Sequence, residues 1–283
     1  MIRTRFAPSP TGHLHLGHAY AAQVAWQLAQ SLDGDFLVRF EDIDHTRVRD
    51  EFYRSTLDDL KWLGFHPFPE PQSQLDHLED YQRALEILQT LGVVYPCFCS
   101  RRDIQSEIEN MPRAPHGPEG PLYPGTCRHL SHAERKAKES TSQPPVWRLD
   151  ATKAAEITGP LTFSDGRLGT FSVDPHLLGD VILARRDIGT SYHLAVVLDD
   201  ARQQITHVTR GKDLLSSTHI HRLLQTLLEL PEPQYLHHVL VTDDAGHRLA
   251  KRDAARSLHQ LREQGSSPRE ILAMLPPMPC FPD

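Results

Sequence analysis

Segment 5–18, near the N-terminus, combines residue types that suit the binding of an anion. The residues that follow it are rich in Ala, Gln and Leu, which predicts a helix whose first turn carries His15, Gly17 and His18. A helix N-terminus presents unpaired N–H groups and partial positive charge, and both favour a phosphate. By spacing alone, His13, His15 and His18 are equally consistent with a metal site or with surface histidines, since the chain contains 18 histidines.

The elements around this segment predict how it is held. A short strand ends at Phe6, and Pro8 and Pro10 then impose an extended turn. Residues 35–43 alternate apolar and polar side chains and are expected to form a second strand that ends near Glu41. A strand, helix, strand order is half of a doubly wound parallel sheet, in which ligands bind outside the carboxyl ends of the strands. Glu41 is therefore placed to face a ligand, although an exposed carboxylate at a strand end explains the pattern as well.

The complete string from Arg5 to His18 resembles the signature of the class I aminoacyl-tRNA synthetases, within their glutamyl branch. That branch has the pattern RFAPSPTGxLHxGH, and His-Leu-Gly-His stands at its HIGH box. The resemblance implies that His15 and His18 hold the phosphates of ATP and that Gly17 lies under the adenine. The segment 39–44, Arg-Phe-Glu-Asp-Ile-Asp, is similar to the family string RIEDTD, which implies that its glutamate recognises the amino-acid substrate. On the same basis the substrate, L-glutamate, is contacted by Arg5, Phe6, Ala7, Pro8, Ser9 and Glu41.

Further family strings occur in the second half of the chain. Residues 191–200 and 206–213 resemble TYxxxxVVDD and THVxRGxD, which implies that Tyr192 and Arg210 contact the amino acid. A planar guanidinium can also pair with a carboxylate through two hydrogen bonds, which suits Arg210. The loop 246–252 lines up with the KMSKS box, so that Lys251 is expected to reach the ATP phosphates, while Ala250 replaces the serine of that box.

Three of the four cysteines lie close together in the sequence. Cys97 and Cys99 offer two sulfur ligands and Cys127 a third, which predicts a structural zinc ion, one per chain. Without a metal, they would be three buried structural cysteines. The candidates for a fourth ligand are Tyr123, His129 and His132. Chemistry alone favours a histidine, whereas the resemblance of this region to the family string YxGxCR implies Tyr123.

Together these patterns predict an α/β protein with a doubly wound, Rossmann-like catalytic domain. We expect its first half at 1–78, an inserted zinc-containing α+β subdomain similar to an acceptor-binding domain at 79–178, and its second half at 179–236. Residues 237–283 are expected to hold the KMSKS-like loop and a short helical region.

Composition limits the class of protein. The net charge of −7 argues against a surface coated in basic charge, although arginine pairs such as Arg101-Arg102 and Arg185-Arg186 could meet phosphates locally. No apolar run approaches the ~20 residues that span a bilayer, and the N-terminus lacks a signal-peptide pattern. A cytoplasmic monomer without membrane association is expected.

The resemblance also implies a reaction. The family is a ligase family that activates its amino acid with ATP and Mg²⁺, a reaction that needs positioning and charge stabilisation but no side-chain nucleophile. Full glutamyl-tRNA synthetases continue into a helical anticodon-binding region, whereas this chain ends at 283. It therefore resembles the short branch, which activates glutamate without tRNA and transfers it to queuosine in the anticodon loop of tRNA(Asp). The alternatives are a truncated enzyme that charges a tRNA 3′ end and a non-catalytic zinc RNA-binding module.

Overall fold

The computed structural model describes residues 1–111, 116–118, 120–141, 143–242 and 257–281. The chain opens with a parallel βαβ unit. β1 (Arg3–Phe6) and β2 (Asp35–Phe40) are parallel neighbours, with Arg3 opposite Asp35, and α1 (Leu16–Ser31) connects them. β3 (Gln72–Ser73) extends the sheet beside β2.

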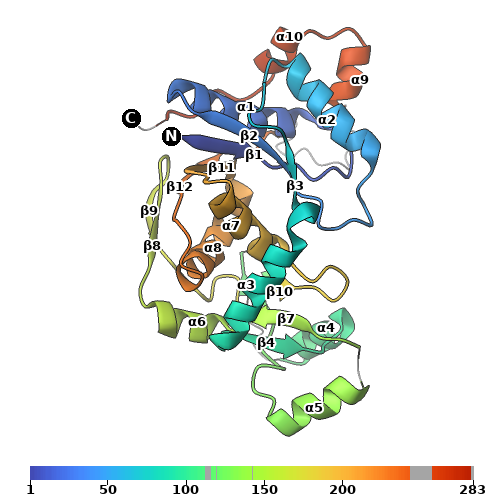
Figure 1. The fold of residues 1–283 in the computed structure, drawn as a ribbon, viewed down its shortest axis with the longest axis vertical. Coiled ribbons are helices and arrows are strands. Elements are labelled where there is room, and N and C mark those ends of the chain that lie inside the picture. The colour runs from blue at the N-terminus through green and yellow to red at the C-terminus, as the bar shows by residue number, and fades with distance from the viewer. Residues whose placement is uncertain (112–115, 119, 142, 243–256, 282–283) are drawn as a thin grey trace.

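A second group of parallel strands adjoins β1. β11 (His207–Gly211) is parallel to β12 (Gln234–His238), and the N–H of Thr206 donates to the carbonyl of Arg3 at 3.0 Å, which sets β11 beside β1. β8 (Thr162–Asp165) is parallel to β12, and β9 (Gly169–Ser172) forms a hairpin with β8. The two halves thus meet at β1 and β11, and their strands end near one another (Figure 1).

Helices cover this sheet with small and apolar side chains. α1 packs closely because its buried face includes Ala22, Ala25 and Ala29. The same core is closed by α2 (Asp50–Trp62), α9 (Leu258–Glu263) and α10 (Pro268–Ala273). A second core is built by α3 (Leu78–Thr90), α7 (Tyr192–Arg202) and α8 (Leu215–Leu227). Two 3₁₀ turns, η1 (Gln74–His77) and η2 (Lys212–Leu214), precede α3 and α8.

A separate small sheet lies at the opposite end of the molecule from α9 and α10 (Figure 1). β7 (Val146–Leu149) is its central strand and pairs antiparallel with both β4 (Val94–Cys97) and β10 (Ile182–Ala184). Around it lie α4 (Arg101–Asn110), α5 (His132–Thr141), α6 (Ala151–Thr158) and a hairpin of β5 (His116–Gly117) with β6 (Gly120–Pro121).

The α/β class and the parallel, Rossmann-like sheet are confirmed. Several boundaries differ from expectation. The strand expected at 35–43 ends at Phe40. α4 and α6 were not expected. The β8–β9 hairpin, expected within the insertion, joins the main sheet through β12.

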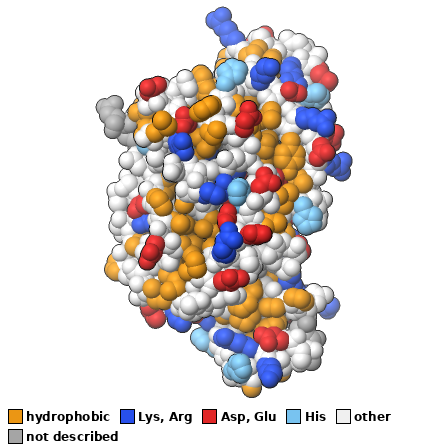
Figure 2. All heavy atoms as spheres, viewed as in Figure 1, with side chains coloured by type: hydrophobic (Ala, Val, Ile, Leu, Met, Phe, Trp, Pro, Cys, Tyr) orange, Lys and Arg blue, Asp and Glu red, His pale blue; other side chains and the backbone are white. Residues whose placement is uncertain are grey.

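Charged side chains of both signs are interspersed with apolar groups over the face shown in Figure 2, without a wide field of one sign. This distribution fits the modest net charge of −7. Among the described residues, no helix combines the length and the apolar character that a membrane crossing requires.

Candidate active site and metal centre

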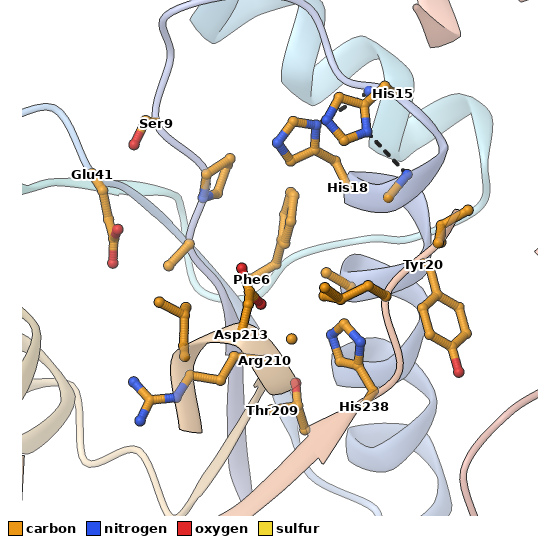
Figure 3. A pocket seen from close by; sticks show the side chains of 18 of the residues that line it. Phe6, Ser9, His15, His18, Tyr20, Glu41, Thr209, Arg210, Asp213 and His238 are labelled. Carbon is orange, nitrogen blue, oxygen red and sulfur yellow. Dashed lines mark hydrogen bonds between the residues drawn. The ribbon is translucent and has the colours of Figure 1, made fainter. Parts of the chain in front are cut away.

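A pocket of about 380 Å³ opens where β1, β2, β11 and β12 end. It is lined by every predicted glutamate- and ATP-binding residue that the structure describes: Arg5, Phe6, Ala7, Pro8, Ser9, His15, Gly17, His18, Glu41, Tyr192 and Arg210. Figure 3 shows that Ser9 and Glu41 lie at one side of the pocket, His15 and His18 at another, and Arg210 across from the histidines. Lys251, predicted in the KMSKS-like loop, lies outside the described residues. The fold therefore brings together segments that are far apart in the sequence.

The two histidines begin α1 and cap each other's backbone. His15 is the N-cap: its Nδ1 accepts from the N–H of Gly17 at 3.0 Å, and Nδ1 of His18 accepts from the N–H of His15 at 3.2 Å. A neutral ring whose Nδ1 accepts carries its proton on Nε2. Both rings therefore present an N–H at Nε2, and their centroids are 3.9 Å apart. This pair is a donor arrangement that suits phosphate oxygens.

Gly17 is required by the packing of His15. A Cβ at position 17 would lie 2.9 Å from Cε1 and 3.1 Å from Nδ1 of the His15 ring. Such contacts are too short, so a side chain here would displace the ring. The ring of His15, which caps α1, therefore lies directly beside Gly17, the residue predicted to lie under the adenine.

A buried ion-pair network supports Arg5. Asp200 accepts from Nε of Arg5 at 3.0 Å and from Nη2 at 3.4 Å, and it also accepts from Nη1 of Arg39 at 2.7 Å. The Thr209 carbonyl accepts from Nη1 of Arg5 at 3.1 Å. Burial favours the neutral acid, but Arg5 and Arg39 together hold the pKa of Asp200 below its usual value. One carboxylate thus fixes both Arg5, which lines the pocket, and Arg39, which is fully buried.

Glu41 lies at the end of β2, as its place in the sequence predicts. The N–H of Glu41 donates to the carbonyl of Pro8 at 3.0 Å, which joins the strand end to the proline turn. Its carboxylate is 3.7 Å from Nη2 of Arg39. Burial raises the pKa of Glu41 to about 7, against the opposing effect of Arg39 and Arg5. A cationic ligand group such as an ammonium would favour its ionised form.

Arg210 faces the pocket from β11 and is 6% exposed. Its guanidinium donates to the hydroxyl of Tyr192 at 3.2 Å, so the two residues predicted to contact the amino acid also contact each other. The pocket thus has a carboxylate and two guanidinium groups near one end, and imidazole N–H donors at another. This arrangement can hold an amino acid with an acidic side chain beside a nucleotide.

The described cysteines 97, 99 and 127 form a cluster in the small sheet's module. Their sulfur atoms lie within 4.8 Å of one another, and Sγ of Cys99 is 3.5 Å from Sγ of Cys127. Tetrahedral zinc with bonds of about 2.3 Å to sulfur requires sulfurs about 3.8 Å apart, so the spacing fits. Among the described residues, no histidine joins this group, and His129 and His132 are exposed.

The hydroxyl of Tyr123 faces the three sulfurs. It is 3.3 Å from Sγ of Cys97 and 3.6 Å from Sγ of Cys99, and it accepts from the N–H of Cys127 at 2.9 Å. The hydrogen bond between Cys97 and Cys99 lowers the pKa of the Cys97 thiol and raises that of Cys99, so within this pair the thiolate is favoured on Cys97. Three sulfurs and one oxygen are a donor set that a zinc ion can accept.

Comparison with known proteins bears on this arrangement. Residues 1–278 match the family model described as tRNA synthetases class I (E and Q), catalytic domain. The chain is 48% identical over 278 residues to a glutamyl-Q tRNA(Asp) synthetase from Rhodobacter capsulatus, in a match that covers 96% of this chain and 99% of that protein. A glutamyl-Q tRNA(Asp) synthetase from Nitratidesulfovibrio vulgaris is 41% identical, with 97% of this chain and 86% of the relative covered. The chain belongs to the class I tRNA synthetases, in the glutamyl-Q tRNA(Asp) synthetase family.

A solved structure of the same class supports the fold of this synthetase family member. The glutamate-tRNA synthetase from Elizabethkingia anophelis is similar with a TM-score of 0.79 and 26% identity. The match covers 96% of this chain and 60% of the solved chain, so this chain spans about 60% of the length of that enzyme.

Several residues of the site were not predicted from the sequence. Asp200 supports Arg5 and does not itself line the pocket, and it could have been found because the family string TYxxxxVVDD ends on it. Thr209, Asp213 and His238 also line the pocket, and Figure 3 shows His238 on the side away from Glu41. Asp213 could have been found in the same way, because the family string THVxRGxD ends on it. No motif or periodicity pointed to Thr209 and His238, which become part of the site only when β11 and β12 come together.

Proposed function

We propose that the protein activates L-glutamate with ATP and transfers the glutamyl group to queuosine in the anticodon loop of tRNA(Asp). The observation that carries this proposal is one pocket with imidazole donors at one end and Glu41 and Arg210 at another. The chain that forms it is 48% identical to a glutamyl-Q tRNA(Asp) synthetase along nearly its whole length. The activation step takes place without tRNA. It yields glutamyl-adenylate and pyrophosphate.

In the activation step, the α-carboxylate of glutamate attacks the α-phosphorus of ATP in line, and pyrophosphate leaves. His15 and His18 donate from Nε2 to phosphate oxygens, Gly17 borders the adenine, and Lys251 binds the phosphates. Mg²⁺ that accompanies ATP offsets part of the phosphate charge. Because the carboxylate is itself the nucleophile, the protein's task is to position the reactants and to stabilise charge.

At the other end of the pocket, Glu41 accepts from the ammonium group of the substrate, and Arg210 pairs with its side-chain carboxylate. Arg5, fixed by Asp200, and Tyr192 contribute further donors. The amino-acid site is also lined by the end of β1 and the turn after it, at Phe6, Ala7, Pro8 and Ser9. The opposite charges of Glu41 and Arg210 match the two ends of glutamate.

A zinc ion held by Cys97, Cys99, Tyr123 and Cys127 has a structural role in this proposal. Bound zinc would tie the start of α4 to the turn at 123–128 and so stiffen a module with a small core. The close sulfur atoms and the tyrosine hydroxyl among them support this ligand set.

Locating the transferred glutamate tests the proposal. The protein is incubated with radiolabelled glutamate, ATP and tRNA(Asp) prepared from cells that do or do not make queuosine, and the RNA is digested to nucleosides. We expect label on the queuosine nucleoside and none in RNA that lacks it. Alkali-labile label on the 3′ adenosine of RNA without queuosine would refute the proposal and favour ordinary charging. Absence of glutamate-dependent ATP–pyrophosphate exchange without RNA would instead favour a non-catalytic RNA-binding protein.

A further inference from the structure

The guanidinium of Arg210 is surrounded by neutral hydrogen-bond acceptors. Nε donates to Nε2 of His237 at 3.1 Å, and Nη2 donates to the hydroxyl of Thr218 at 2.7 Å. Nη1 donates to the hydroxyl of Tyr192 and to Nδ1 of His221, both at 3.2 Å. None of these four partners is a carboxylate.

Two neighbouring guanidinium groups differ in this respect. Arg5 and Arg39 share the carboxylate of Asp200, and Arg39 also lies 3.7 Å from the carboxylate of Asp199, so both cations have anionic partners inside the protein. Arg210 makes no ion pair within 4.0 Å among the described residues. A buried cation with only neutral partners keeps its attraction for an anionic ligand, and that attraction is strong where water is excluded. It does not extend to a neutral carboxamide of the same shape.

The hydrogen-bond pattern determines the tautomer of His237. A guanidinium can only donate, so Nε2 of His237 must accept, and its proton must be on Nδ1. Nδ1 is 2.7 Å from Oδ2 of Asp165, which accepts that proton's hydrogen bond. Both side chains are fully buried. Asp165 therefore holds His237 in the one neutral form that can accept from Arg210.

The carboxylate of Asp165, at the end of β8, is itself fixed by the backbone of β12 and of the turn after β8. Its carboxylate also accepts from the N–H groups of His237 at 2.8 Å, Arg167 at 3.0 Å and Leu168 at 2.8 Å. Burial lowers the pKa of His237, with Arg210 and His238 acting in the same direction and Asp165 opposing them. The ring is therefore neutral near pH 7, as the acceptor role requires.

The tautomer of His221, the second histidine beside Arg210, is determined in the same way. His221 accepts from Arg210 through Nδ1, so its proton lies on Nε2, which is 3.3 Å from Nδ1 of His193. Burial holds the pKa of His221 well below its ordinary value, and the neighbouring Arg210 and His193 lower it further. Two neutral histidines from different elements thus bracket one guanidinium.

We infer that Asp165 and His237 are positioning residues for substrate selection. They fix Arg210 as an uncompensated cation that accepts the side-chain carboxylate of glutamate and rejects the carboxamide of glutamine. This inference rests on the proposed function, in which Arg210 meets that carboxylate. Asp165 and His237 touch no substrate and act through Arg210.

Two substitutions of His237 separate this role from a purely structural one. His237→Gln places an amide oxygen near the former Nε2, so it retains an acceptor for Arg210 but not the bond to Asp165. His237→Asn places its amide near the former Nδ1, so it retains the bond to Asp165 and leaves Nε of Arg210 without an acceptor. Exposed His176 supplies the control, His176→Asn.

Binding of L-glutamate and of L-glutamine is measured by titration calorimetry, and the KM for each substrate by ATP–pyrophosphate exchange. We expect His237→Asn to weaken glutamate binding roughly tenfold to a hundredfold, the effect of losing a hydrogen bond to a charged group, and to reduce the preference over glutamine. His237→Gln should stay closer to the wild type, and the KM for ATP should be unchanged in both. The opposite order, with His237→Asn nearly normal and His237→Gln impaired, would mean that the pair only ties β8 to β12 and would overturn the inference.

A measurement on the unaltered protein does not depend on the folding of variants. Nitrogen NMR of protein labelled in its histidine rings reports which ring nitrogen carries the proton. We expect His237 to carry it on Nδ1 near pH 7 and above; a proton on Nε2 would overturn the inference. If the wild-type protein bound no glutamate at all, the proposed function would fail instead, so the two failures are distinguishable.

Discussion

Replacement of Glu41 by glutamine tests how the pocket recognises the ammonium group of its substrate. Burial raises the pKa of Glu41 to about 7, despite Arg39 and Arg5 nearby. Only the ionised carboxylate can form a charge-assisted pair with an ammonium, so the free protein must lose a proton from Glu41 before it binds glutamate well. As pH falls through 7, this carboxylate becomes protonated and glutamate binding weakens.

The size of the effect follows from the pKa. With a pKa of about 7, roughly one Glu41 in ten is ionised at pH 6 and about nine in ten are ionised at pH 8. The KM for glutamate should therefore rise about tenfold from pH 8 to pH 6. Glu41→Gln removes both the charge and the titration, so its KM at pH 8 should be roughly tenfold to a hundredfold higher than that of the wild type and nearly independent of pH.

The assay is glutamate-dependent ATP–pyrophosphate exchange at saturating ATP, from pH 6 to pH 8.5, with the wild type and Glu41→Gln in parallel. Saturating ATP separates glutamate binding from any effect of pH on ATP binding. The reasoning is refuted if the variant keeps the tenfold change of the wild type, because another group would then be titrating. A wild-type KM that is constant over this range would refute it as well.

Three further substitutions test other parts of the structure. Asp200→Asn removes the carboxylate between two buried guanidinium groups. Because Arg39 is fully buried, we expect the free energy of unfolding, measured by urea titration, to fall by about 3–5 kcal/mol. A loss under about 1 kcal/mol would contradict this. Gly17→Ala places a Cβ against the His15 ring, so the KM for ATP should rise while the KM for glutamate changes little. Equal effects on both KM values would argue against separate ATP and glutamate ends of the pocket. Tyr123→Phe removes the oxygen atom beside the cysteines, so a chelator should remove zinc faster from the variant than from the wild type. An unchanged rate of zinc removal would exclude Tyr123 as a ligand.

The sequence by itself determined the features that depend on neighbours in the chain. The helix start at His15, the glycine at 17 and the paired cysteines 97 and 99 are local patterns, and their geometry follows from a few consecutive residues. The α/β class also follows, because the alternation of strand and helix patterns leaves few ways to build a layered sheet. The resemblance to a synthetase signature then placed Arg5, Glu41, Tyr192 and Arg210 in one site.

The tertiary structure decided which groups support those residues. Asp200 reaches Arg5 across 195 positions, and Asp165 reaches His237 across 72. Neither contact has a local signal, because hydrogen bonds between distant strands depend on how the sheet is assembled rather than on periodicity. The same reason explains why the β8–β9 hairpin was expected in the insertion and is found on the main sheet. The sequence thus predicted which groups meet the substrate, and only the assembled sheet shows why Arg210 is left as the uncompensated charge among them.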